Sequence, residues 1–140
     1  MHSSSRAGLR PLFGLCRHLI AAFSVVALAH SALAATTTVT GADNGKTIQL
    51  KALDTLVVRL DSNVSTGFSW SVLPTSTPLL KLQDRVYQDP EQPVPGRGGT
   101  QVFTFQTVSP GTGVLTLHYI RPWEKADPME TRFTVNISIQ

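Results

Sequence analysis

The chain has 140 residues, with 12 lysine and arginine side chains, 9 aspartate and glutamate side chains, one cysteine and four histidines. Residues 1–34 hold three of the basic residues, the cysteine, three of the histidines and no acidic residue, so nine basic and nine acidic side chains remain in residues 35–140. Because residues 35–140 have no net charge, their composition does not indicate nucleic-acid binding. Because they have no cysteine, they can form no disulfide and hold no cysteine nucleophile.

The first 34 residues have the three parts of a secretory signal peptide. Three arginines and no acid come first, an apolar run follows over 19–29, and the small-residue pattern Ala32-Leu33-Ala34 ends the segment. The apolar run is shorter than the roughly 20 residues that a permanent membrane helix needs, and an uncleaved anchor is the alternative interpretation. We therefore predict cleavage after Ala34, one domain over 35–140, a periplasmic or secreted location, and no membrane attachment after cleavage.

Residues 35–140 show a β pattern throughout, because apolar and polar residues alternate over short runs. The C-terminal run is the clearest, with Phe133, Val135, Ile137 and Ile139 on one face. Segments rich in glycine, asparagine, aspartate and proline separate the runs and favour turns. In chain order, the predicted strands are 36–40, 46–52, 55–61, 68–73, 79–87, 100–108, 114–121 and 132–139.

Seven or eight short strands in about 100 residues predict an all-β fold, an immunoglobulin-like antiparallel β-sandwich, with a closed barrel as the alternative. Trp70 is expected in the core, on a central strand and facing the other sheet. Three segments do not fit the strand pattern, namely 61–67, 88–99 and 121–129. Because an even number of predicted strands separates successive segments, all three can lie at the same end of the sandwich, where loops commonly carry function.

Residues 35–140 lack the groups that most catalytic sites need. Their only histidine, His118, alternates within a predicted strand on the face opposite the core, where an ordinary surface residue is expected. One histidine without cysteine does not fit the usual zinc spacings, and the glycine-rich run 96–99 has no phosphate-loop lysine. Paired carboxylates for glycoside hydrolysis stay open on residue type alone, but the acidic residues show no recognisable spacing. We therefore expect no enzyme activity and no metal or cofactor.

Three motifs occur in order along the three segments. The first is Asn63-Val64-Ser65-Thr66-Gly67-Phe68-Ser69-Trp70. The second is Gly96-Arg97-Gly98-Gly99, which is followed by Phe103 and Phe105. The third is Arg121-Pro122-Trp123. Together they resemble the pattern of the chagasin-type inhibitors of papain-like cysteine proteases, over essentially the whole of residues 35–140.

The resemblance implies an immunoglobulin-like sandwich that blocks a papain-like cysteine protease reversibly and without covalent chemistry. It implies that 61–67, 88–99 and 121–129 form a wedge across the active-site cleft, with the first segment near the catalytic cysteine of the protease. The protease-binding residues that it implies are Asn63, Val64, Ser65, Thr66, Gly67, Phe68, Gly96, Arg97, Gly98, Gly99, Arg121, Pro122 and Trp123.

The residue types suit a wedge. Ser65 and Thr66 are small and carry hydroxyls, and Gly67 is expected to supply a positive φ angle. Asn63 can brace the turn by bonding to backbone two residues on. Arg121 and Trp123 belong to residue types that are enriched at binding hot spots. A local ion pair with Glu124 is the alternative role of Arg121. The glycines of 96–99 are expected to let the backbone approach a partner closely.

Two positions depart from the family pattern. Val64 stands where proline is usual, and Ser65 stands where threonine is usual. Without the proline the free loop is less restricted, so more entropy is lost on binding and the affinity is expected to fall. The alternative function is a secreted β-sandwich module for adhesion or carbohydrate binding, which would use one face or edge. A monomer is expected in either case.

Overall fold

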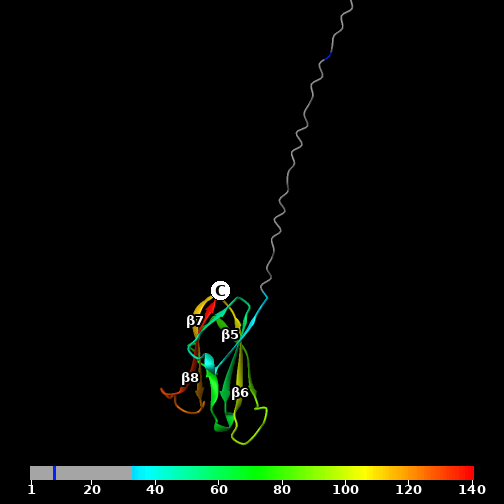
Figure 1. The fold of residues 1–140 in the computed structure, drawn as a ribbon. Helices are drawn as coiled ribbons and strands as arrows, with labels where there is room; N and C mark the ends of the chain where they lie inside the picture. The colour runs from blue at the N-terminus through cyan, green and yellow to red at the C-terminus, as the bar shows by residue number, and fades with distance from the viewer. Residues whose placement is uncertain (1–7, 9–32) are drawn as a thin grey trace, which may run out of the picture. The chain divides into compact units, whose positions relative to one another are not determined.

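Eight strands form two β-sheets in the part of the chain that the computed structural model describes, which is Gly8 and residues 33–140. The strands are β1 Thr36–Thr40, β2 Thr47–Leu50, β3 Thr55–Ser62, β4 Ser69–Val72, β5 Leu80–Gln88, β6 Gly99–Thr107, β7 Gly111–Ile120 and β8 Thr131–Ile139. One sheet has the order β1-β3-β6-β5 and the other β2-β8-β7-β4 (Figure 1). The prediction of a β-sandwich is confirmed.

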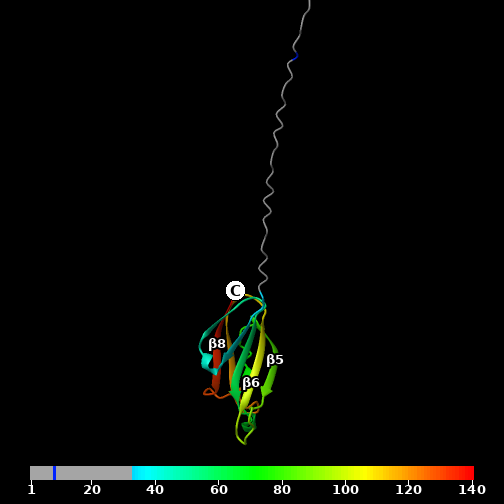
Figure 2. The same cartoon turned by 45° about the vertical axis from the view of Figure 1, so that its right-hand side comes forward.

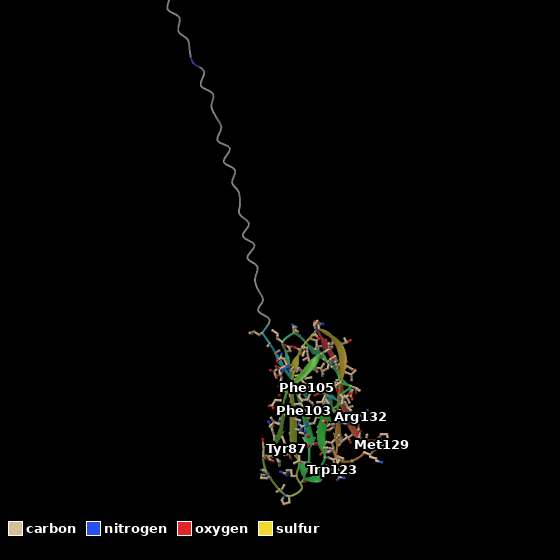
Figure 3. The ribbon with its side chains drawn as sticks, turned by 180° about the vertical axis from the view of Figure 1, so that it is seen from behind. Tyr87, Phe103, Phe105, Trp123, Met129 and Arg132 are labelled. Atoms are coloured by element: carbon tan, nitrogen blue, oxygen red, sulfur yellow. The ribbon has the colours of Figure 1, made fainter. Side chains whose placement is uncertain are left out.

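The core lies between the two sheets and follows the alternation in the sequence. Along β6 and β8 every second side chain is buried, and the large residues among them are Phe103, Phe105 and Phe133. The rings of Phe103 and Phe105 lie 6.4 Å apart between their centroids, well inside the domain (Figure 3). Each such side chain stabilises the fold by about 1.5–3 kcal/mol, so these strands are fixed in register.

Two of the six strand pairings are parallel, a detail that the predicted antiparallel sandwich did not include. β1 runs parallel to β3, and β2 runs parallel to β8. Between β1 and β2 the chain reverses through the short 3-10 helix η1, Gly41–Asp43, and changes sheet. Gly45 completes the reversal with a φ of 82°, and its N–H donates to the carbonyl of Thr134 over 2.6 Å. Each of the two short strands therefore lies beside a strand of its own direction.

Trp70 is buried, with 7% of its surface exposed, so its predicted core position is confirmed. Its strand, β4, lies at the edge of its sheet, so the prediction of a central strand is wrong. The amide of Gln101, on β6 of the other sheet, accepts from the N–H of Trp70 over 2.8 Å and donates to its carbonyl over 3.1 Å. The indole Nε1 donates to the carbonyl of Asp61 over 2.9 Å. This buried bridge ties the edge strand to the opposite sheet.

The connections β3–β4, β5–β6 and β7–β8 lie together at one end of the sandwich (Figures 1 and 2). The C-terminal residue lies at the other end, where the N–H of Gln140 donates to the carbonyl of Leu50. The strand count that placed all three loops at one end is therefore confirmed. No helix among the described residues is long and apolar enough to span a membrane.

Candidate functional site

The first loop connects β3 to β4 and braces itself. Asn63 Oδ1 accepts from the backbone N–H of Ser65 over 3.3 Å and from its hydroxyl over 2.6 Å. The hydroxyl of Thr66 donates to the carbonyl of Asn63 over 2.6 Å, at the end of the 3-10 helix η2, Val64–Thr66. Gly67 then adopts a φ of 80°, in the left-handed region. The expected roles of Asn63 and Gly67 in the turn are confirmed, and the tip exposes Val64, Ser65 and Thr66.

An aromatic stack supports the base of this loop. The ring of Tyr119, on β7, lies 5.3 Å from that of Phe68 and 5.0 Å from that of Trp70, measured between centroids. The hydroxyl of Tyr119 accepts from the backbone N–H of Asn63 over 2.9 Å. Because the stack rests on strands of the core, the first loop has a rigid foundation.

The second loop lies against one side of the first. Asn63 Nδ2 donates to the carbonyl of Gly96 over 3.2 Å. A Cβ atom on Gly98 would lie 2.7 Å from the carbonyl oxygen of Ser62, and one on Gly99 would clash with the carbonyl oxygen of Gln88 and lie 2.8 Å from the hydroxyl of Tyr87. Glycines 98 and 99 are therefore needed for close packing within the domain itself, which the sequence-based expectation of close approach to a partner did not foresee.

Arg121 joins the third loop to the other side of the first. Its Nε donates to the carbonyl of Thr66 over 3.0 Å, and its guanidinium carbon lies 4.3 Å from the centroid of Phe68. Its Nη1 also lies 3.0 Å from Glu124 Oε1, so the local ion pair is confirmed. Since one guanidinium makes all three contacts, Arg121 acts as a bracket between the two loops.

Trp123 is 71% exposed and lies across Gly67. A Cβ atom on Gly67 would lie 2.5 Å from the indole Cη2 and 2.9 Å from Cζ2. Figure 3 shows Trp123 at the loop end, away from the core phenylalanines. One face of the indole is thus supported by the first loop while the other faces solvent, which is the arrangement that an exposed binding anchor needs.

The three loops together make one continuous edge. The first loop is the centre, with the glycine-rich second loop on one side and Trp123 on the other. Among the described residues there is no group of three or more histidine, cysteine, aspartate or glutamate side chains that could hold a metal ion. Small groups flanked by a packed glycine-rich loop and one large aromatic side chain suit entry into a narrow cleft, which is a binding arrangement.

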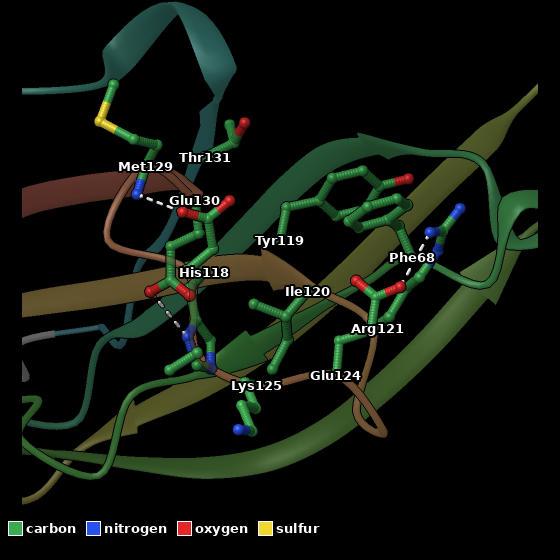
Figure 4. A pocket seen from close by; sticks show the side chains of 12 residues that line it. Phe68, His118, Tyr119, Ile120, Arg121, Glu124, Lys125, Met129, Glu130 and Thr131 are labelled. Carbon is green, nitrogen blue, oxygen red and sulfur yellow. Dashed lines mark hydrogen bonds and ion pairs between the residues drawn. The ribbon is translucent and has the colours of Figure 1, made fainter.

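Sequence reasoning missed a partly buried ionic cluster beside the third loop. The prediction that His118 is an ordinary surface residue is wrong, because its side chain is 16% exposed and its Nδ1 lies 3.1 Å from Glu130 Oε1. Arg132 Nη2 lies 2.9 Å from the same oxygen. His118 and Glu130 line a pocket of about 410 Å³ between β7 and the third loop (Figure 4). The pairing of β7 with β8, which sets His118 opposite Arg132, is the signal that could have revealed the cluster.

Comparison with known proteins finds one family and its members. Residues 49–137 match the family described as chagasin family peptidase inhibitor I42. Chagasin of Trypanosoma cruzi is 31% identical over 101 residues, which cover 69% of this chain and 92% of that protein. Amoebiasin-2 of Entamoeba histolytica is 28% identical over 115 residues, which cover 81% of this chain and 93% of that protein.

A solved structure shares the fold. The crystal structure of the cysteine protease inhibitor EhICP2 from Entamoeba histolytica matches with a TM-score of 0.68 at 24% identity, over 77% of this chain and 98% of that one. At this level of identity the match concerns the fold alone, and it agrees with the two-sheet arrangement described above.

Proposed function

The chain belongs to the chagasin family of peptidase inhibitors, and we propose that it inhibits papain-like cysteine proteases reversibly and without covalent chemistry, by occluding the active-site cleft with its three loops. Membership of this family makes the chain an inhibitor rather than an enzyme, and favours inhibition over adhesion or carbohydrate binding. The observation that carries the proposal is the bracing of the loops into one edge, through Asn63 to Gly96 and through Arg121 to Thr66.

Each loop has a physical role in this proposal. The first loop, with small exposed residues at its tip, enters the cleft near the catalytic cysteine. The glycine-rich second loop lies along one wall of the cleft, and Trp123 packs on the other. Because contacts within the domain already hold the loops together, little conformational entropy is lost on binding, which offsets the missing proline at Val64.

The test is inhibition of papain by the purified protein. We expect stoichiometric inhibition in which activity returns on dilution and mass spectrometry finds no covalent adduct. Trypsin, a serine protease, serves as the control and is expected to stay fully active. Full papain activity at a large molar excess of the protein, repeated with several other papain-like proteases, would refute the proposal.

The location of the protein is a second part of the proposal. Residues 1–34 act as a signal peptide that is removed after Ala34, so the inhibitor is periplasmic or secreted and free of the membrane. Apart from Gly8, Leu33 and Ala34, this segment lies outside the described residues, and the support is its sequence pattern. N-terminal sequencing of the exported protein is expected to begin at Ala35, and an uncleaved N-terminus would contradict it.

We also propose that the inhibitor works as a monomer. The outer edge of β5 carries Lys81, Asp84 and Arg85, and its register shifts between Leu82 and Asp84. Asp84 Oδ1 accepts from the backbone N–H of Arg85 over 2.8 Å, which occupies a donor that another strand could use. Charges and bulges of this kind oppose edge-to-edge pairing. Sedimentation equilibrium is expected to give the monomer mass at micromolar concentration.

A further inference from the structure

Glu130 is a buried carboxylate at the point where the third loop ends and β8 begins. Its side chain is 5% exposed, and its Oε1 lies 3.1 Å from His118 Nδ1 and 2.9 Å from Arg132 Nη2. Its Oε2 is also buried and has no hydrogen-bond partner within the described residues. One carboxylate therefore links the end of the loop to β7 through His118 and to β8 through Arg132, as Figure 4 shows for the histidine.

Stability alone does not account for this carboxylate. The buried carboxylate of Glu130 loses most of its hydration, although the side chain of Arg132 is 53% exposed, and apolar side chains of similar volume commonly stabilise a fold as well as buried charges do, or better. An unpartnered buried oxygen adds to the cost. Such a cluster can instead fix the position of the chain segments that it joins, because an ionised carboxylate accepts hydrogen bonds from fixed directions.

The third loop needs such a fixed point. Every residue over 122–129 is exposed, so the loop is held mainly at its two ends. Arg121 fixes its start through Thr66 and Phe68. At its end, the N–H of Glu130 donates to the carbonyl of Asp127 over 3.1 Å, and the carboxylate of Glu130 bonds to the two strands. Without the carboxylate contacts, the end of the loop is held only by its own backbone bond and by the pairing of Thr131 with Tyr119 where β8 begins.

We propose that Glu130 is a positioning residue for protease binding, whose carboxylate fixes the end of the third loop so that Trp123 is held across Gly67. This inference rests on the proposed function, because it assigns Glu130 a role in inhibition without contact with the protease. It concerns a side chain outside the three motifs.

The first test does not need a protease. Backbone ¹⁵N relaxation over 122–129, and that of the Trp123 indole N–H, is compared between the full protein and its Glu130→Met variant, which keeps an unbranched side chain but removes the acceptor. We expect order parameters to fall from about 0.85 to below about 0.6 in the variant, as in a flexible loop. Unchanged order parameters would overturn the proposal, whether or not the protein inhibits any protease.

The second test separates positioning from stability. Glu130→Met is expected to weaken papain inhibition about tenfold, because the loosened third loop must be ordered when it binds. Its melting midpoint is expected to stay within a few degrees of that of the wild type. Glu130→Gln, which keeps the Oε1 acceptor, should recover most of the inhibition. The matched control is Asp54→Asn, a buried carboxylate at the opposite end of the sandwich, which should lower the midpoint and leave inhibition unchanged.

A second residue keeps the inference testable if Glu130→Met does not fold. His118→Phe fills the same space on β7 without a donor, whereas His118→Asn places an amide N–H close to the position of Nδ1. We expect the phenylalanine variant to inhibit more weakly than the asparagine variant. Equal inhibition by the two, or inhibition that simply follows the melting midpoint across all variants, would refute the positioning role. If the wild type itself inhibits no papain-like protease, the proposed function fails and the relaxation test alone decides.

Discussion

Replacing Gly67 by alanine changes the point where the first and third loops meet. The new Cβ would lie 2.5 Å from Cη2 and 2.9 Å from Cζ2 of Trp123, closer than carbon atoms can pack. The indole is 71% exposed and joined to the loop by rotatable bonds, so it can swing away. We therefore expect Gly67→Ala to fold, with Trp123 displaced from its place across the first loop.

The magnitude has two parts. An alanine at a φ of 80° costs about 1–2 kcal/mol of conformational strain, which lowers the melting midpoint by about 4–8 °C for each kcal/mol in a domain of this size. Displacing Trp123, the proposed anchor, is expected to cost about 2 kcal/mol or more of affinity, which is about 30-fold in the inhibition constant. The loss of inhibition should thus exceed what strain alone would produce.

Gly45→Ala is the matched control. Gly45 has a φ of 82°, and no atom lies within 4 Å of its added Cβ, so it carries the same strain without the indole contact. Thermal unfolding followed by circular dichroism and titration against papain are measured on both variants. Similar melting midpoints with weakened inhibition only in Gly67→Ala are expected. Equal inhibition constants in the two variants would refute the reasoning.

Three further predictions concern anchoring, acid stability and strain. Trp123→Ala should weaken inhibition by at least tenfold with a cooperative melt at nearly the wild-type midpoint, and loss of the melt would mean that Trp123 is part of the core. Backbone N–H groups of Ala35 and Lys51 hold the pKa of Asp54 below 3.8, so the stabilisation by its carboxylate is present above pH 3.8 and is lost as the pH falls further. The melting midpoint of Asp54→Asn should therefore approach that of the wild type below pH 3.8. A difference between the two midpoints that does not change with pH would contradict this. Leu53 is 68% exposed with a φ of 69°, so Leu53→Gly should stabilise by about 0.5–1 kcal/mol in urea unfolding, because relief of left-handed strain exceeds the entropy cost of glycine.

Local sequence patterns were enough to predict the strands and the position of the three loops at one end of the sandwich. The alternation along Phe133, Val135, Ile137 and Ile139 predicts a strand with one buried face, and β8 has that face. Counting strands between irregular segments then places the three loops at the same end, because each pair of strands runs out and back. The bracing role of Asn63 followed from side-chain chemistry over two residues.

What the sequence did not reveal depends on contacts between distant segments. Alternation shows which face of a strand is buried but carries no direction, so the parallel pairings of β1 and β2 went unrecognised. Trp70 was expected on a central strand of the immunoglobulin-like sandwich, yet Gln101 allows an edge strand to bury it. The partner of His118, Glu130, lies in the loop directly before β8, and only the register of β7 and β8 brings the two together.

The ends of the described domain have a practical consequence. The carbonyl of Ala35 accepts from the N–H of Thr55, and the N–H of Gln140 donates to Leu50, so both ends are fastened at the pole away from the loops. A tag, fluorophore or resin joined through a short spacer at either end therefore leaves the three loops facing solution. Beads carrying the domain in this orientation could pull active proteases from a mixture and release them on elution, and the same geometry suits two copies fused in tandem for avidity.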